Sequence, residues 1–168
     1  MVILRGTKKL LKALDVKPVE ALAPSTNVLG EWYAHLIETA AGDLVIFANA
    51  RTLLSVALPT SALARLIPLF AARVYNLLRA IGVPDRLAAQ EIVAYQDVLL
   101  AKTADRSVLG SLNEIARYYQ YVAEASKPDA PLSLQEVELE LSRYLHKPLG
   151  YRYPAEIAID LFTRGQKG

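Results

Sequence analysis

The chain has 168 residues, of which 53% are hydrophobic and 21% are charged, and its formal net charge is +2. This length suits one domain with a substantial core, because burial of so many apolar side chains can offset the entropy lost on folding. There is no cysteine, which excludes disulfides, zinc fingers, iron–sulfur clusters and thiol catalysis. A chain without cysteine needs no oxidising compartment, so we expect a cytoplasmic protein.

Membrane association is not expected from the apolar segments. A membrane span needs roughly 18 apolar residues, and the nearest candidate, residues 66–72, is flanked by Arg65 and Arg73. The N-terminal apolar run ends at Arg5, whereas a secretory signal places its charges first and a longer apolar run after them. We expect no membrane partner, and the small net charge leaves nucleic acid open as a partner.

The chain is predicted to begin with a strand over residues 2–5, a glycine turn and a short helix over residues 8–14. The leucines of that helix share one face. Residues 15–28 contain prolines and small polar residues and are predicted to form a loop.

An antiparallel meander of three strands is predicted next. In its first strand Trp32 and Tyr33 lie on opposite faces, with His35 on the same face as Tyr33. The second run is continuously apolar, which is typical of a strand buried on both faces. The three strands are residues 29–38, 44–48 and 53–58, joined by turns at residues 41–43 and 49–51.

The middle of the chain is predicted to be helical. Apolar residues recur at spacings of three and four over residues 63–81, which is typical of a helix that faces a core. Pro68 is expected to kink this helix or divide it in two, and Gly82 is expected to end it. A short helix over residues 84–95 and a last strand over residues 98–102 complete this part.

Three further helices are predicted, over residues 106–125, 134–146 and 154–162. The second begins at a capping box, in which Ser133 accepts a backbone hydrogen bond and Glu136 reaches back. It is expected to dock on the rest of the protein through one apolar stripe. The stripe consists of Leu134, Val137, Leu141 and Tyr144.

These elements predict a single α+β domain over residues 1–168. We expect a small, mostly antiparallel sheet, made of the meander and the N-terminal strand, covered by several helices. Residues 127–168 are expected to form a helical C-terminal extension packed on it. No internal repeat or low-complexity segment divides the chain.

Metal and cofactor sites are not expected. His35 and His146 are the only histidines, and no HExxH motif is present. Glu136 and Glu140 share a helical face, where a solvated acidic surface is the usual explanation. A serine triad also lacks support, because G-x-S-x-G is absent and His35 is expected to be a half-buried structural residue. No catalytic residue can therefore be named.

Two segments are candidates for an anion site. At the first turn, backbone N–H groups of Thr7 and Lys8 open a helix, although the phosphate-binding pattern G-x-x-x-x-G-K is absent. In the second segment, Arg106 and Asn113 share one helical face, and a guanidinium can grip two oxygens of a phosphate or carboxylate. The two segments can meet only if the strands that precede them belong to the same sheet and run in the same direction. The alternative is a solvated lysine face and a surface ion pair of Arg106.

Other polar and aromatic residues complete the set of candidates. Asn49 and Arg51 lie in the second turn of the meander and are included as ligand-binding candidates. Several tyrosines could form a stacking surface for bases, although scattered tyrosines usually pack with their hydroxyls at the surface. These are Tyr118, Tyr119, Tyr121, Tyr144, Tyr151 and Tyr153.

The chain resembles an uncharacterised bacterial and archaeal family that is known only as a domain of unknown function. The resemblance covers about residues 1–125, and a similar arrangement occurs in some plasmid- and transposon-borne proteins. It implies no catalytic residue, because the family has no assigned activity, and it leaves the helices after Ser133 as an unmatched extension. The segments that carry it are LRGTKKLLKAL, LGEWYAHLI, LVIFANARTLLSVAL and TADRSVLGSLNE.

Two functions remain open. The first is a non-enzymatic binding or interaction module for an anionic ligand or a protein partner, which the resemblance would connect to mobile elements or host defence. The second is an enzyme that acts on a phosphorylated or nucleotide substrate through Lys8, Arg106 and Asn113. The absence of a catalytic constellation favours the first, whereas a cleft joining Lys8, Asn49 and Arg106 would favour the second.

Overall fold

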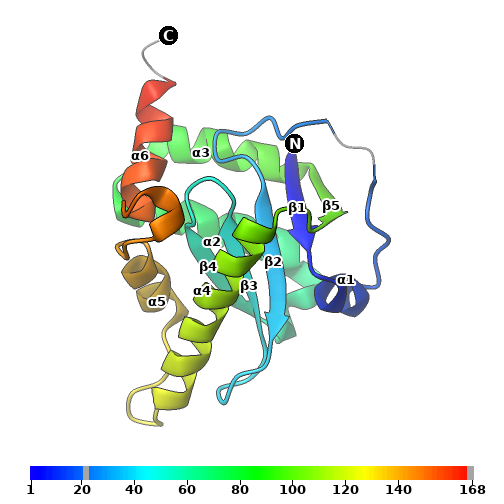
Figure 1. Cartoon of the computed structure of the whole chain (residues 1–168), viewed down its shortest axis with the longest axis vertical. Helices are drawn as coiled ribbons and strands as arrows, with labels where there is room; N and C mark the ends of the chain where they lie inside the picture. The colour runs from blue at the N-terminus through cyan, green and yellow to red at the C-terminus, as the bar shows by residue number, and fades with distance from the viewer. Residues whose placement is uncertain (21–22, 166–168) are drawn as a thin grey trace.

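A five-stranded sheet with helices on both faces forms the centre of the protein (Figure 1). The structure is a computed structural model that describes residues 1–20 and 23–165, so part of the predicted loop and of the C-terminal extension lies outside the described residues. The strand order is β4-β3-β2-β1-β5. The strands are β1 (Val2–Gly6), β2 (Trp32–Ile37), β3 (Leu44–Asn49), β4 (Ser55–Pro59) and β5 (Val98–Lys102).

The sheet is mixed, so the prediction of a mostly antiparallel sheet is wrong, although the α+β class fits. The predicted meander is confirmed, because β2 pairs antiparallel with β3 and β3 with β4. β1, however, pairs in parallel with β2 on one side and with β5 on the other. Tight turns enforce antiparallel pairing, whereas the long connections into β2 and β5 leave strand direction to tertiary packing.

The predicted helices are present, with some changes in their bounds. The helix predicted over residues 63–81 is divided, as expected from Pro68: a 3-10 helix, Thr60–Arg65, precedes α2 (Leu66–Ile81). The proline lies in the first turn of α2, where a backbone N–H has no intrahelical acceptor. None of the helices in the described ranges combines the length and apolar character needed to span a bilayer. The helices are α1 (Lys8–Leu14), α2 (Leu66–Ile81), α3 (Asp85–Val93), α4 (Arg106–Ala125), α5 (Leu134–Leu141) and α6 (Pro154–Arg164), with short 3-10 helices at Thr60–Arg65, Ala94–Gln96 and Lys147–Leu149.

Each face of the sheet carries its own apolar core. On one face Phe70 of α2 stacks on Phe47, with ring centroids 4.3 Å apart, and meets the edge of Trp32 at 5.3 Å. On the other face Tyr33 packs in the same cluster as Tyr119 of α4. The predicted alternation of Trp32 and Tyr33 is confirmed, and β3 is buried along its whole length, as its continuous apolar run predicted.

A buried polar network attaches the loop before β2 to α3. The Trp32 indole N–H donates to the Tyr95 hydroxyl at 2.8 Å, and that hydroxyl lies 3.4 Å from a Glu91 carboxylate oxygen. The carboxylate also accepts from the backbone N–H groups of Val28 and Leu29 and from the Asn27 amide. Burial raises the pKa of Glu91, and these hydrogen bonds oppose the increase.

The polar side of α5 closes the exposed edge of the sheet. The buried Glu138 carboxylate accepts from the Ala57 backbone N–H of β4 at 3.1 Å and pairs with Arg73 of α2. An edge strand with free N–H groups invites pairing with other chains. Glu138 occupies one such group, and Arg73 compensates the buried charge.

The apolar stripe predicted for residues 134–146 is confirmed at Val137 and Leu141, which are buried. The helix ends at Leu141, however, and Tyr144 is 44% exposed beyond it. The Ser142 hydroxyl donates to the Leu139 carbonyl at 2.6 Å, and such local bonds compete with continuation of a helix.

We expect Leu141→Ala to lower the free energy of unfolding by about 2–5 kcal/mol, because it removes a buried side chain and leaves a cavity. Urea unfolding followed by circular dichroism measures the change. Leu145→Ala is the matched control, since Leu145 is 54% exposed. An equal urea midpoint for Leu141→Ala and the wild type would mean that α5 does not contribute to the core.

We expect Tyr95→Phe to cost about 1–3 kcal/mol, because it leaves the buried indole N–H of Trp32 without an acceptor. The same urea titration, read through the fluorescence of the single tryptophan, gives the value. Tyr121→Phe is the control, because Tyr121 is 68% exposed. Similar losses in both variants would contradict the assigned role of this network.

Candidate functional site

The carboxyl ends of β1 and β5 lie side by side at one edge of the sheet. The register pairs Gly6 with Lys102, and both strands run in the same direction, so the condition for the two predicted segments to be neighbours is met. α1 turns toward the face of Trp32, where Leu10 packs, and α4 turns toward the opposite face, where Leu112 packs. Ligands of open α/β sheets bind where connections diverge in this way.

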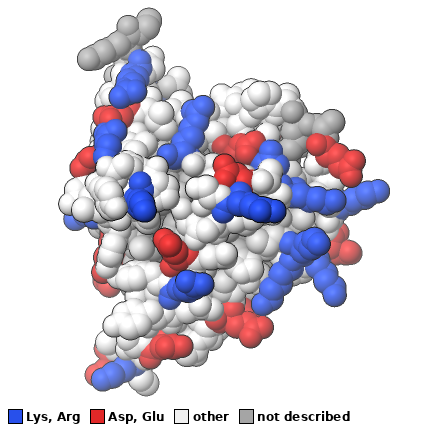
Figure 2. Space-filling view, in the orientation of Figure 1, with Lys and Arg blue, Asp and Glu red and all other residues white. Residues whose placement is uncertain are grey.

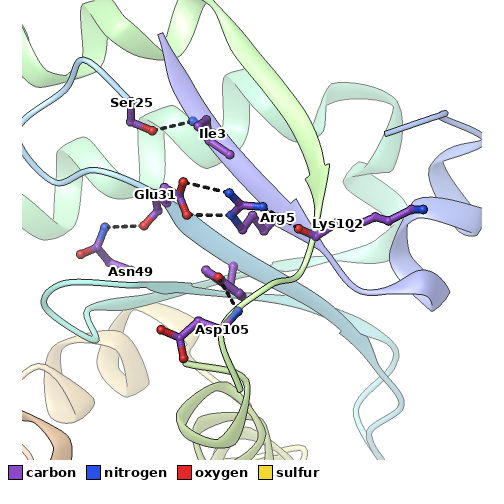
Figure 3. Close-up of polar contacts among 8 residues, drawn as sticks. Ile3, Arg5, Ser25, Glu31, Asn49, Lys102 and Asp105 are labelled. Carbon is purple, nitrogen blue, oxygen red and sulfur yellow. Dashed lines mark hydrogen bonds and ion pairs between the residues drawn. The ribbon is translucent and has the colours of Figure 1, made fainter. Parts of the chain in front are cut away.

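An arginine clamp fixes this edge (Figure 3). Arg5 Nε donates to Glu31 Oε2 at 2.7 Å, and its Nη2 donates to Glu31 Oε1 at 3.1 Å. The remaining Nη1 donates to the Lys102 carbonyl at 2.9 Å. The hydrogen bonds to Glu31 raise the pKa of Arg5. Arg5 therefore connects the segment before β2 to the end of β5 across β1, and its guanidinium is occupied by the protein itself.

The start of α4 is positioned from the sheet. The Tyr33 hydroxyl accepts from the backbone N–H of Asp105 at 3.1 Å. The Asp105 carboxylate in turn accepts from the backbone N–H groups of Ser107 at 2.8 Å and Val108 at 3.3 Å. These first-turn N–H groups are therefore already occupied, and any attraction of an anion to this region must come from the Arg106 side chain.

A threonine–histidine pair lies where β1 ends. Thr7 Oγ1 is 2.9 Å from His35 Nδ1, and consequently the Thr7 side chain makes no capping bond to α1. Burial, and then the charge of Lys9, lower the pKa of His35, which favours the neutral ring. Residue spacing does not predict this pair, because the register between two parallel strands cannot be deduced from it.

Exposed cations surround this edge. Figure 2 shows Lys and Arg side chains gathered over α1 and beside the end of β5. Lys9 lies 3.5 Å from the Glu38 carboxylate. The other cations here have no ion pair among the described residues, and we call this set the basic edge. It consists of Lys8, Lys12, Lys102 and Arg106.

Asn49 lies at the other end of the sheet, because it pairs with Trp32 at the start of β2. Its side-chain amide nitrogen donates to the carbonyls of Leu29 and Glu31 at 3.0 and 3.1 Å. Its oxygen accepts from the Thr52 hydroxyl at 2.9 Å and from two backbone N–H groups. The protein therefore uses both ends of this buried amide to fix the turn after β3.

The remaining predicted residues separate into two places. Arg51 lies beside Asn49 and donates to the Val28 carbonyl at 3.0 Å. Asn113 is exposed on α4, about 10 Å along the helix axis from Arg106 at the standard helical rise. The structure thus pairs Gly6, which precedes Thr7 and Lys8, with Lys102, which lies shortly before α4, and places Asn49 and Arg51 at the other end of the sheet.

The main clefts of the described residues lie away from the basic edge. Five clefts, with volumes between about 180 and 690 Å³, are lined by other residues. A cleft that joins Lys8, Asn49 and Arg106 is not among them. The arrangement is therefore an open, positively charged surface.

We expect Lys9→Gln to raise the pKa of His35, because it removes a neighbouring positive charge. A pH titration of the His35 ring by NMR measures the shift, with Lys17→Gln as the control.

The lowered pKa of His35 also makes stability depend on pH. A folded pKa below the unfolded value of about 6.5 means that the folded state binds fewer protons between the two values. The contribution of His35 to the free energy of unfolding is thus present at a pH above its pKa in the unfolded state, and it is lost as the pH falls through its pKa in the folded state. An unchanged pKa in Lys9→Gln would contradict the electrostatic effect of Lys9.

Comparison with known proteins identifies a family. A family model described as "Domain of unknown function (DUF6933)" matches residues 3–157. The match includes α5 and the start of α6, so the expectation that the helices after Ser133 lie outside the resemblance is wrong. No curated protein and no solved structure matches the chain. Because the matched region covers most of its length, the chain belongs to the DUF6933 family.

Proposed function

We propose that the protein is a non-catalytic binding module that takes a phosphate-bearing ligand at the basic edge. The parallel pairing of β1 with β5 is the observation that carries this proposal. It places Lys102 directly beside Gly6, two residues before Lys8. Figure 3 shows the Lys102 side chain extending from the end of β5 away from Arg5 and toward the side of α1.

The kind of cation at this edge supports a phosphate-bearing ligand. Lysine ammonium groups are mobile point charges that suit phosphates in several positions, and the Arg106 guanidinium can bind two phosphate oxygens at once. The chain as a whole carries a net charge of only +2, so this concentration of unpaired cations is local. A local positive field raises the encounter rate with anions and makes their binding sensitive to salt.

The binding module is proposed to be one domain with residues 127–168 packed on it. Support comes from Glu138 of α5, which bonds both to β4 and to Arg73 of α2. A further bond runs from the Tyr118 hydroxyl of α4 to the Glu140 carboxylate of α5. These contacts attach the C-terminal helices to the sheet that positions the basic edge.

A second candidate is an enzyme that acts on a phosphorylated or nucleotide substrate. The hydrogen-bonded pair of Thr7 and His35 favours it, because a hydroxyl activated by a neutral imidazole is a nucleophile of known type. No carboxylate is hydrogen-bonded to His35 among the described contacts. The missing orienting group and the open surface favour binding without turnover.

We expect a short fluorescein-labelled oligonucleotide to bind the wild type with an affinity that falls as salt rises. The double variant Lys8→Gln/Lys102→Gln should weaken this binding and reduce the slope of log K against log salt by about 0.7–0.9 for each lost phosphate contact. Fluorescence anisotropy across a salt series measures both effects. Lys127→Gln/Lys147→Gln removes the same charge from exposed lysines elsewhere and should leave the slope unchanged.

Competition experiments show which class of phosphate-bearing molecule binds. Displacement of the oligonucleotide by unlabelled nucleotide, but not by inorganic phosphate, would identify a nucleotide ligand, and displacement by nucleic acid alone would identify a polymer. An equal loss of oligonucleotide affinity in both double variants would overturn the basic edge as the binding site. If the wild type releases phosphate from the nucleotide and Thr7→Val abolishes that release, the non-catalytic proposal is overturned in favour of the enzyme.

A further inference from the structure

A second surface lies between the end of α5 and the start of α6. The Ala155 backbone N–H donates to the Ser142 carbonyl at 2.9 Å, which holds the start of α6 against the end of α5. The chain between them turns back, so that Tyr153 returns to the region of Tyr144. The cleft that results has a volume of about 690 Å³. Its lining includes Glu136, Leu139, Glu140, Arg143, Tyr144 and Tyr153.

The aromatic side of this cleft is exposed, and its Tyr144 is held in place by Tyr118. Tyr144 and Tyr153 are 44% and 38% exposed, and Leu145 is 54% exposed. The Tyr144 ring lies 5.4 Å from that of Tyr118 at an interplanar angle of 59°, and the two hydroxyls are 3.5 Å apart. Exposed tyrosines in a fixed position are suited to binding, because little side-chain entropy remains to be lost.

The helix side of this cleft is acidic. Glu136 and Glu140 lie four residues apart on α5, and both are exposed. Like charges at this spacing oppose helix formation. The Tyr118 hydroxyl donates to Glu140 at 2.6 Å and so orients its carboxylate. Glu136 has no ion pair in the described part of the chain, and Arg143 is the cleft's single lining cation.

Tyr151, in the loop beside the cleft, has a strained backbone conformation. Gly150 and Tyr151 both have positive φ, 64° and 58°, and an isolated bridge pairs His146 with Arg152. The left-handed region is unfavourable for a residue with a side chain. Tyr151 is 62% exposed and therefore gains little packing energy to offset the strain. Strain held at an exposed aromatic residue is common in binding loops.

We infer that this cleft binds a basic segment of a protein partner. An arginine or lysine side chain of the partner would lie between the carboxylates of Glu136 and Glu140 and the ring faces of Tyr144 and Tyr153. Its alkyl part, or an adjacent apolar residue, would pack on Leu139. A cation is attracted electrostatically both by carboxylates and by aromatic ring faces, whereas a phosphate backbone would be repelled by the two glutamates.

This surface is distinct from the basic edge. In Figure 1, α5 and α6 lie on the left of the molecule and α1 lies on the right. The two sites are built from different elements and carry opposite charge, so occupation of one leaves the other free. The inference therefore stands or falls independently of the proposed phosphate-bearing ligand.

Two fluorescein-labelled peptides of equal length test this inference, one alternating arginine with leucine and the other alternating glutamate with leucine. We expect the arginine peptide alone to bind in fluorescence anisotropy. Glu136→Gln/Glu140→Gln should weaken binding at least tenfold, and Tyr153→Ala should weaken it severalfold. The controls are Glu114→Gln/Glu124→Gln and Tyr121→Ala, which change exposed residues that do not line the cleft.

Unchanged thermal melting of each variant shows that the fold is intact. Equal weakening by the control double variant would mean that overall charge attracts the peptide, and it would overturn the site. Binding of the glutamate peptide would also overturn the inference. The inference would likewise fail if a single-stranded oligonucleotide bound and its affinity fell in Tyr153→Ala, because that result would indicate bases stacking on the tyrosines. Lys8→Gln/Lys102→Gln should leave peptide binding unchanged, which separates this result from failure of the basic edge.

Discussion

The arrangement of this protein depends on β1, which is paired in parallel on both of its sides. β2 joins it after α1 and a loop, and β5 joins it after two further helices. With β1 between β2 and β5, the connections after β1 and β5 can leave toward opposite faces, and both faces acquire a helical layer. Arg5 then holds the three strands together through Glu31 and the Lys102 carbonyl. Without this pairing the basic edge would not exist.

Charged groups inside the protein join segments that secondary structure leaves unconnected. Glu91 holds the loop before β2, Glu138 covers the edge of β4, and Arg5 with Glu31 connects strand ends. A buried charge adds little net stability when it replaces well-packed apolar residues, but removal of its partner is costly. Their effect is to select one arrangement, because any other would leave a carboxylate buried and unpaired. They are therefore structural, and the candidate binding groups are the unpaired charges at the surface.

The small net charge conceals two surfaces of opposite sign. The basic edge gathers Lys8 and Lys102, and the cleft between α5 and α6 gathers Glu136 and Glu140 beside exposed tyrosines. Because charges farther apart than about 10 Å are largely screened at moderate salt, each proposed site would attract its ligand independently of the other. A module with both sites could hold a phosphate-bearing molecule and a basic protein segment at once. Membership of the DUF6933 family leaves this chemistry open.

The sequence determined the features that depend on neighbouring residues. The bounds of α1, the opposite faces of Trp32 and Tyr33 and the cap at Ser133 follow from helical or strand periodicity and local hydrogen bonding. The exposed lysine at position 8 was likewise predicted as a candidate from its place at a turn.

Tertiary structure alone decided which segments meet. It paired β1 with β5 and buried Asn49 within its own turn. It also joined Thr7 to His35 and formed the cleft beyond Leu141. The hydrogen bond from Arg5 to the Lys102 carbonyl spans 97 residues. Residue spacing predicts structure over a few turns of helix or a short strand, whereas strand order and direction result from the packing of the whole chain around both faces of the sheet.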